Sequence, residues 1–181
     1  MTNPFFTLGH SDRTLEAFLD VLAGAGVQSL VDVRKLPGSR SNPQFDEDVL
    51  APVLASAGIR YRHDAALGGL RPVSKTVPFE VNALWRNRSF HNYADYALSG
   101  AFTDALDRLR SEGAQLATTV MCSEAVWWRC HRRLIADHLI ASGQDVRHIM
   151  GEGRIDPAAL TRGALVHPDG RVTYPAALRP E

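Results

Sequence analysis

One short segment holds most of the reactive side chains of this 181-residue chain. Residues 120–139 read VMCSEAVWWRCHRRLIADHL and contain both of its cysteines, Cys122 and Cys130, and two of its three tryptophans. The apolar run before Cys122 predicts a strand, and apolar residues at helical spacing further on predict a helix. A cysteine that ends a strand and faces a helix N-terminus has its pKa lowered by backbone donors and the helix dipole. Cys122 is therefore a candidate nucleophile, with a small apolar core residue as the alternative.

The spacing around Cys122 bears on which thiol chemistry is expected. Cysteine phosphatases place an arginine after five intervening residues, so that loop amides and the arginine surround one phosphate. Here Trp128 occupies that position and Arg129 comes one residue later, so this cradle does not fit. The segment LVDVR at residues 30–34 is similar to a strand end of rhodanese-like sulfur-transfer domains. Sulfur transfer through Cys122 is therefore an alternative.

Metal binding is a second chemistry open to the same segment. Cys122, Cys130 and His131 offer three ligands, and His10 or His63 could complete a set of four. Zinc sites more often use pairs two to four residues apart, and adjacent side chains on a helix diverge by about 100°. The sequence therefore requires no metal or other cofactor and leaves the cofactor open, with a metal at Cys122, Cys130 and His131 as the alternative. A disulfide between the cysteines is geometrically feasible but is not expected in a reducing compartment.

Glu124 and His131 are the acid–base candidates. A carboxylate beside apolar tryptophans has its pKa raised, which suits Glu124 to general acid–base catalysis or to a nucleophilic or stabilising role in glycosidic bond cleavage. The alternative is a helix N-terminal carboxylate paired with Arg129 or Arg132. His131 could donate to a phosphate or shuttle a proton.

Apolar residues recur at strand spacing and at helix spacing in alternating segments of the chain. These segments indicate the strands and helices that position the candidate residues. Five apolar segments indicate strands, and amphipathic segments between them indicate helices. The alternation predicts a single α/β domain over residues 1–181, with a mostly parallel open sheet of about five strands and helices on both faces. Two short runs around a Pro-Asp-Gly turn predict a small C-terminal hairpin. The expected strands are FFTLGHS, VQSLVDVR, IRYRHD, QLATTVMC and VRHIM, and residues 65–92 are expected to be a long irregular segment.

The residues after the first four predicted strands are mostly polar and reactive. Open parallel sheets bind ligands outside the carboxyl ends of their strands, so we expect these residues to share one pocket. Arginine forks beside aromatic rings are a recurrent means of holding nucleotides, and packing in the core is the alternative for the aromatic residues. The expected substrate-binding residues are His10, Ser11, Arg34, Arg40, Asn42, His63, Arg71, Tyr93, Trp128 and Arg132.

Several of these stretches also resemble a known family. TLGHS, LVDVRKLPGSRSNPQF, AGIRYRHDAALGGLR, SFHNYADYAL, MCSEAVWWRCHRRLIADHL and VRHI occur in the order found in the bacterial and archaeal family numbered 488 among the domains of unknown function. The resemblance covers about residues 6–150 and leaves 151–181 as a C-terminal extension. The family commonly has alanine where this chain has Ser123, and Cys122 and Glu124 are kept. The resemblance implies an α/β domain with the polar signature of an enzyme, and no particular reaction.

The composition and charge of the chain bear on whether it is a membrane, secreted or nucleic-acid-binding protein. No apolar stretch reaches the roughly 20 residues that cross a bilayer, and the start MTNPFFTLGH lacks a signal-peptide pattern, so we expect a soluble cytoplasmic protein with no membrane partner. The net charge is zero, which gives no overall attraction to nucleic acid. Of twenty cationic side chains, only Lys35 and Lys75 are lysine, and arginine is the residue whose planar fork fits phosphate oxygens.

Taken together, these patterns predict an enzyme that acts on a phosphate-bearing substrate, either a nucleotide or a nucleic acid. Arginines at the strand ends would bind the anion, and Cys122, Glu124 and His131 would be catalytic. The alternatives are rhodanese-like sulfur transfer through Cys122 and a non-catalytic nucleic-acid-binding module, which would bind in a salt-dependent way without Cys122 or Glu124.

Overall fold

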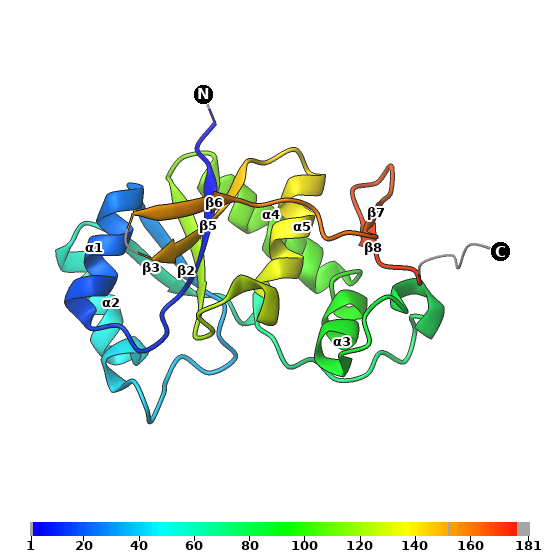
Figure 1. Cartoon of the computed structure of the whole chain (residues 1–181), viewed down its shortest axis with the longest axis horizontal. Helices are drawn as coiled ribbons and strands as arrows, with labels where there is room; N and C mark the ends of the chain where they lie inside the picture. The colour runs from blue at the N-terminus through cyan, green and yellow to red at the C-terminus, as the bar shows by residue number, and fades with distance from the viewer. Residues whose placement is uncertain (1, 152, 177–181) are drawn as a thin grey trace.

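A six-stranded sheet lies at the centre of the protein (Figure 1). The computed structural model describes residues 2–151 and 153–176, so residue 152 and the last part of the predicted C-terminal extension, 177–181, lie outside the described residues. The strand order is β3-β2-β4-β1-β5-β6. The first five strands are parallel and β6 is antiparallel to β5. The predicted mostly parallel open sheet is therefore confirmed.

The sheet has one strand more than the sequence predicts. The strands are β1 (Phe5–Gly9), β2 (Ser29–Asp32), β3 (Arg60–His63), β4 (Thr118–Cys122), β5 (Val146–Gly151) and β6 (Arg154–Pro157). The additional strand, β6, has mostly exposed side chains because it lies at the edge of the sheet. Four residues without apolar alternation give no periodic signal for a strand.

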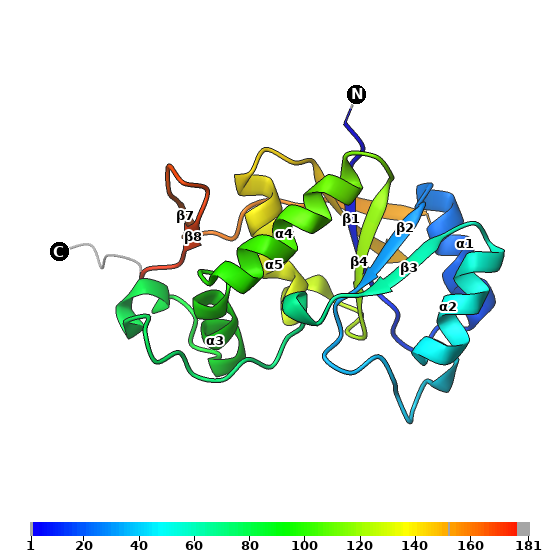
Figure 2. The same cartoon turned by 180° about the vertical axis from the view of Figure 1, so that it is seen from behind.

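Helices cover both faces of the sheet, as predicted. They are α1 (Leu15–Ala25), α2 (Glu47–Ser56), α3 (Arg88–Tyr96), α4 (Gly100–Gly113) and α5 (Arg132–Ala141). Figures 1 and 2 show α1 and α2 on one side of the sheet and α4 and α5 on the other. Successive strand residues alternate between two cores, as the pleat requires: Phe5 faces α4 and α5, and Phe6 faces α1 and α2. None of the helices in the described ranges is long and apolar enough to span a membrane.

The order of the connections determines where the sheet can open into a crevice. The chain leaves β1 through α1 on one face and leaves β4 through α5 on the other. These two strands are neighbours, with Gly9 opposite Cys122 at their carboxyl ends. Adjacent strands whose connections diverge in this way form a switch point, where ligands bind in open α/β sheets. The loops that follow β1, β2 and β4 gather at the lower edge of the sheet in Figure 1.

The segment between β3 and α4 is more regular than predicted. The sequence predicts irregular structure over 65–92, but two short 3-10 turns form there and α3 begins within it. Asn87 caps α3, since its side-chain oxygen accepts from the backbone N–H groups of Ser89 and Phe90 at 2.9 and 3.2 Å. The helix has only nine residues and a polar first turn, so its period is hard to recognise in the sequence.

The predicted C-terminal hairpin is confirmed. β7 (Leu165–Val166) pairs antiparallel with β8 (Val172–Thr173), and Tyr174 follows directly and is fully buried. The hydroxyl of Tyr174 donates to Oδ2 of Asp137 in α5 at 2.7 Å, and its backbone N–H donates to Oδ1 of Asn82 at 2.9 Å. Val172 and Tyr174 therefore join the extension to the core that also contains residues of α4 and α5.

This anchor predicts a stability effect. Tyr174→Phe should lower the free energy of unfolding by about 1–3 kcal/mol, because the buried Asp137 carboxyl loses a donor. Urea denaturation followed by circular dichroism measures the loss. Tyr96→Phe is the matched control: its hydroxyl donates to the carbonyl of Ala66 at 2.7 Å, but Tyr96 is only half-buried, so water can replace the bond and the loss should be smaller. Equal losses in the two variants would contradict a special role for the Tyr174 anchor.

Candidate active site

A pocket of about 470 Å³ lies at the carboxyl ends of β1, β2 and β4. The predicted site residues that line it are His10, Arg34, Tyr93, Cys122, Glu124 and His131. They come from separate segments of the chain, so the fold brings this part of the predicted set together. Cys130 and two exposed cations, Lys35 and Arg129, line the same pocket.

Cys122 ends β4 at the floor of this pocket. Its Sγ lies 2.6 Å from Nη1 of Arg132 and 2.8 Å from Sγ of Cys130, and both cysteines are free thiols. Burial raises the pKa of the Cys122 thiol, but the hydrogen bond with Cys130 and the charge of Arg132 outweigh burial and lower the pKa to about 7. The thiolate of Cys122 is therefore accessible at neutral pH.

Cys130 is the thiol partner of this thiolate. Burial and the hydrogen bond with Cys122 raise the pKa of Cys130 well above its usual value. Two thiols this close do not both ionise at neutral pH, because like charges repel strongly in a buried site. The pair therefore presents one thiolate and one S–H donor at the pocket.

Arg132 supports Cys122 from beneath the pocket. It is only 1% exposed and does not line the cavity. Nη1 donates to the carbonyl of Glu124 at 2.5 Å as well as to the sulfur, and Nη2 donates to the carbonyl of Ala125 at 3.2 Å. The sequence predicts that Arg132 binds the substrate anion. Its contacts instead join the Cys122 sulfur to the loop that follows β4.

Two strand ends approach closely around Cys122. The backbone N–H of His10 donates to the carbonyl of Cys122 at 2.8 Å. A Cβ on Gly9 would lie 1.7 Å from the carbonyl oxygen of Glu124, so a larger residue cannot occupy this position without moving the loop. Gly9 therefore allows the loops after β1 and β4 to meet at the pocket floor.

His131 faces Cys130 with an acceptor nitrogen. Its Nε2 lies 3.0 Å from the carbonyl oxygen of Val33, so the ring proton resides there and Nδ1 is left as the acceptor. Nδ1 lies 3.5 Å from Sγ of Cys130. Burial lowers the pKa of His131 to about 4, which keeps the ring neutral at physiological pH. A Cβ on Gly69 would lie 2.9 Å from Nδ1, so glycine there leaves room for the ring.

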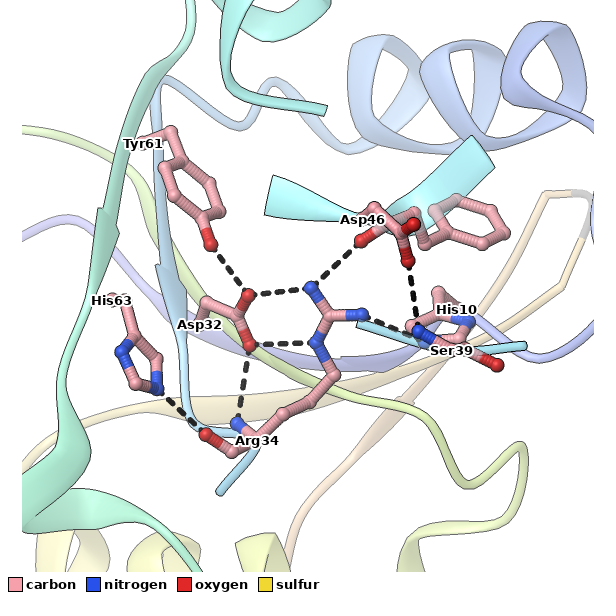
Figure 3. A network of polar contacts seen from close by, with 8 residues as sticks. His10, Asp32, Arg34, Ser39, Asp46, Tyr61 and His63 are labelled. Carbon is pink, nitrogen blue, oxygen red and sulfur yellow. Dashed lines mark hydrogen bonds and ion pairs between the residues drawn. The ribbon is translucent and has the colours of Figure 1, made fainter. Parts of the chain in front are cut away.

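Arg34 is held in a buried ion pair with Asp32 (Figure 3). Nε and Nη2 donate to the two carboxylate oxygens at 2.9 and 2.7 Å, and Nη2 also donates to the carbonyl of Phe45 at 2.8 Å. The hydroxyl of Tyr61 donates to the same carboxylate at 2.6 Å. Nη1 is directed toward Nε2 of His10 at 3.4 Å, and burial lowers the pKa of His10. Most donors of Arg34 are therefore used within the protein, and its charge is balanced by Asp32.

Several predicted site residues do not line the pocket. They are Ser11, Arg40, Asn42, His63, Arg71, Trp128 and Arg132. Nε2 of His63 lies 2.7 Å from the carbonyl oxygen of Arg34. This contact stabilises the loop after β2. Arg71 donates to the carbonyl of Gly68 at 3.0 Å and stacks over the ring of Tyr96.

The structure places the aromatic residues of this region in different surroundings. Trp128 is 44% exposed outside the pocket lining. Tyr93 lines the pocket, but it is 1% exposed and its hydroxyl donates to the carbonyl of Leu67 at 2.7 Å, so it packs in the core. Trp127 stacks on the ring of His148 with the ring centres 4.4 Å apart. Of the two predicted aromatic residues, Tyr93 therefore packs in the core and Trp128 remains exposed.

Lys35 and Cys130 are the pocket residues that the sequence prediction undervalues. Lys35 directly follows Arg34 at the end of β2, and a lysine in a chain that otherwise uses arginine is a signal that could have drawn attention to it. Cys130 is predicted only as a possible metal ligand, and a disulfide with Cys122 is not expected. No group of three or more His, Cys, Asp or Glu side chains in the described ranges is arranged to hold a metal ion, and this includes Cys122, Cys130 and His131.

Residues 14–139 match a family model described as domain of unknown function DUF488. The chain belongs to the DUF488 family. The DUF488 match includes the whole segment from Cys122 to Arg132 and begins after β1 and His10. No curated protein and no solved structure matches the chain.

The Arg132 contact predicts how alkylation of Cys122 in this DUF488 protein depends on pH. The rate of reaction with iodoacetamide should rise with a midpoint near pH 7. Arg132→Gln should shift the midpoint upward, because the neutral amide no longer offsets the burial of the anion. Mass analysis of the Cys122 peptide measures the rate, and circular dichroism checks the fold.

Arg133→Gln is the control for this experiment. Arg133 is the next residue along α5, but its Nε donates to the hydroxyl of Thr161 at 3.1 Å and has no contact with the Cys122 sulfur. This variant should keep the midpoint of the wild-type protein. An unchanged midpoint in a folded Arg132→Gln variant would contradict the role assigned to Arg132.

Proposed function

We propose that this DUF488 protein is a thiol-dependent group-transfer enzyme with Cys122 as its nucleophile. One observation carries the proposal: the sulfur of Cys122 lies 2.6 Å from a buried guanidinium at the floor of a pocket. A thiolate held by a fixed cation at the end of a parallel strand is the arrangement that activates cysteine nucleophiles. A reducing cytoplasmic location, which we also propose, keeps both thiols reduced.

The expected substrate is a small anion. Lys35 and Arg129 line the pocket with exposed charges, and Glu124 is the one carboxylate among the pocket residues that the structure describes. The volume of about 470 Å³ is in the range of small-molecule sites. A polymer would instead be attracted by a long positive surface, and the net charge of zero gives the chain no overall attraction to a polymeric anion.

Sulfur transfer is the thiolate chemistry that these contacts favour. The Cys122 thiolate attacks the outer sulfur of a sulfane-sulfur donor such as thiosulfate, the sulfur–sulfur bond of the donor breaks, and sulfite leaves with the bonding electron pair. Cys122 then carries a persulfide. A phosphoryl group on Cys122 would need free donors around its oxygens, whereas Nη1 and Nη2 of Arg132 are used on the sulfur and on the carbonyls of Glu124 and Ala125.

Loading with sulfur tests this proposal. The protein incubated with thiosulfate should first take one sulfur atom onto Cys122, seen at the earliest times in intact-mass measurement under non-reducing conditions, and cyanide should remove that atom as thiocyanate. Cys122→Ser should gain none, because the nucleophile is absent. Cys130→Ser is the matched control, since it removes the other cysteine and should still gain sulfur. No gain in any variant that keeps Cys122 would overturn the proposal.

A phosphate-bearing substrate, as the sequence predicts, is the second candidate. It is favoured by Lys35 and Arg129, whose exposed ammonium and guanidinium groups line the pocket. A nucleotide fits the pocket size, and a non-catalytic nucleic-acid-binding module is the remaining alternative. That module would leave the contact between Arg132 and the Cys122 sulfur without a role.

Thermal shift measurements separate these candidates. If phosphate is bound, inorganic phosphate and adenosine monophosphate should raise the melting temperature, and the shift should be lost in Lys35→Ala and Arg129→Ala. Lys75→Ala removes an exposed lysine that does not line this pocket and should keep the shift. The absence of a shift with both probes, together with sulfur loading on Cys122, would exclude the phosphate candidate. A shift that Lys35→Ala and Arg129→Ala both keep would place the phosphate site elsewhere.

A further inference from the structure

We propose that Cys130 resolves the persulfide on Cys122, so that the protein reduces sulfane sulfur to sulfide and forms an intramolecular disulfide. This inference rests on the proposed sulfur transfer and adds the fate of the sulfur and the function of the second cysteine. Phosphoryl transfer would give Cys130 no task beyond donating a hydrogen bond.

The distance between the two sulfurs is the first support. The Sγ atoms lie 2.8 Å apart, and a disulfide bond needs roughly 2.05 Å, so closure requires a movement of less than about 1 Å. Both cysteines also line the pocket, where a donor would bind. The residues between them, 123–129, are exposed or half-exposed and include only one short 3-10 turn, so the loop can adjust as the bond forms.

The chemistry of Cys130 is the second support. In the resolving step, the sulfur of Cys130 attacks Sγ of Cys122, a new sulfur–sulfur bond forms, and the bond to the outer sulfur breaks. The outer sulfur leaves as hydrosulfide and takes the proton of the Cys130 thiol. Two electrons pass from the cysteines to the sulfane sulfur, so the charges, hydrogens and electrons balance. A small external thiol then reduces the disulfide and returns the protein to its starting state.

His131 supplies the third support. Its Nδ1 is an acceptor 3.5 Å from Sγ of Cys130, and this contact holds the Cys130 sulfur beside Cys122. The proton on Nε2 is committed to the carbonyl of Val33 at 3.0 Å, and Gly69 leaves space for the ring. The ring is neutral at physiological pH, so it positions the Cys130 sulfur without adding a charge beside the Cys122 thiolate.

A single-turnover experiment without added thiol tests the inference. Wild-type protein and the Cys130→Ser and Cys130→Ala variants are each incubated with thiosulfate. Wild type should release about one sulfide per chain and lose two hydrogen atoms in mass, with neither cysteine open to alkylation afterwards. The two variants should release little sulfide and keep the added sulfur on Cys122. The use of two replacements guards against a folding defect in one of them.

The outcomes separate the inference from the proposal beneath it. Sulfur retained equally on wild type and both variants, with no disulfide, would overturn the role of Cys130 and leave the proposed sulfur transfer in place. No sulfur on any of the three proteins would overturn the sulfur-transfer proposal and the inference with it. Rapid sulfide release from the Cys130 variants at the wild-type rate would also overturn the inference, since another group would then resolve the persulfide.

Discussion

The contact between the buried guanidinium of Arg132 and the sulfur of Cys122 organises the carboxyl edge of the sheet. Arg132 is almost fully buried, and transfer of an isolated charge from water into such a site is costly unless a counter-charge lies close. The thiolate of Cys122 supplies that counter-charge at 2.6 Å. Each group therefore stabilises the charged form of the other in the protein interior. The reactive state of the cysteine and the integrity of the loop after β4 are therefore parts of one interaction.

The ends of β1, β2 and β4 hold the loops around the contact between Arg132 and Cys122 in place. β1 and β4 are neighbours whose connections diverge, and Gly9 lets their ends meet at the loop that Arg132 holds. On the adjacent strand, the ion pair between Asp32 and Arg34 fixes the loop after β2, which carries the carbonyl of Val33 that orients His131. Removal of one partner from such a buried pair typically costs about 3–5 kcal/mol, because the remaining charge is left unpaired. The pocket is thus preorganised by two buried charge pairs on adjacent strands.

The sequence predicts the fold well because strand and helix periods are local properties. β1 to β5, the helices around them and the C-terminal hairpin all follow from apolar spacing and turn residues. β6 and α3 do not, since one has exposed side chains and the other has a polar first turn. The grouping of several strand-end residues in one pocket follows from topology alone.

The roles of individual side chains are less accessible to sequence reasoning. Arg34 and Asp32 lie two residues apart at the end of a strand, where side chains share a face, so their pairing could have been anticipated. Which arginine reaches the Cys122 sulfur depends on where α5 begins, and sequence spacing does not give that direction. The proximity of Cys122 to Cys130 depends on a 3-10 turn between them that has no apolar period. The Arg132 contact and the proximity of the two cysteines are the reasons why we favour sulfur transfer over chemistry on a phosphate group.

The ionisation of Cys122 can be observed directly by following the Cβ carbon shifts of both cysteines with pH in protein labelled with carbon-13 at cysteine. Comparison with Cys122→Ser and Cys130→Ser assigns the two signals. The Cys122 signal should titrate near pH 7 while the Cys130 signal stays that of a thiol well into the alkaline range. A Cys122 signal that titrates at or above the value of an ordinary thiol would contradict the thiolate on which the proposed chemistry depends.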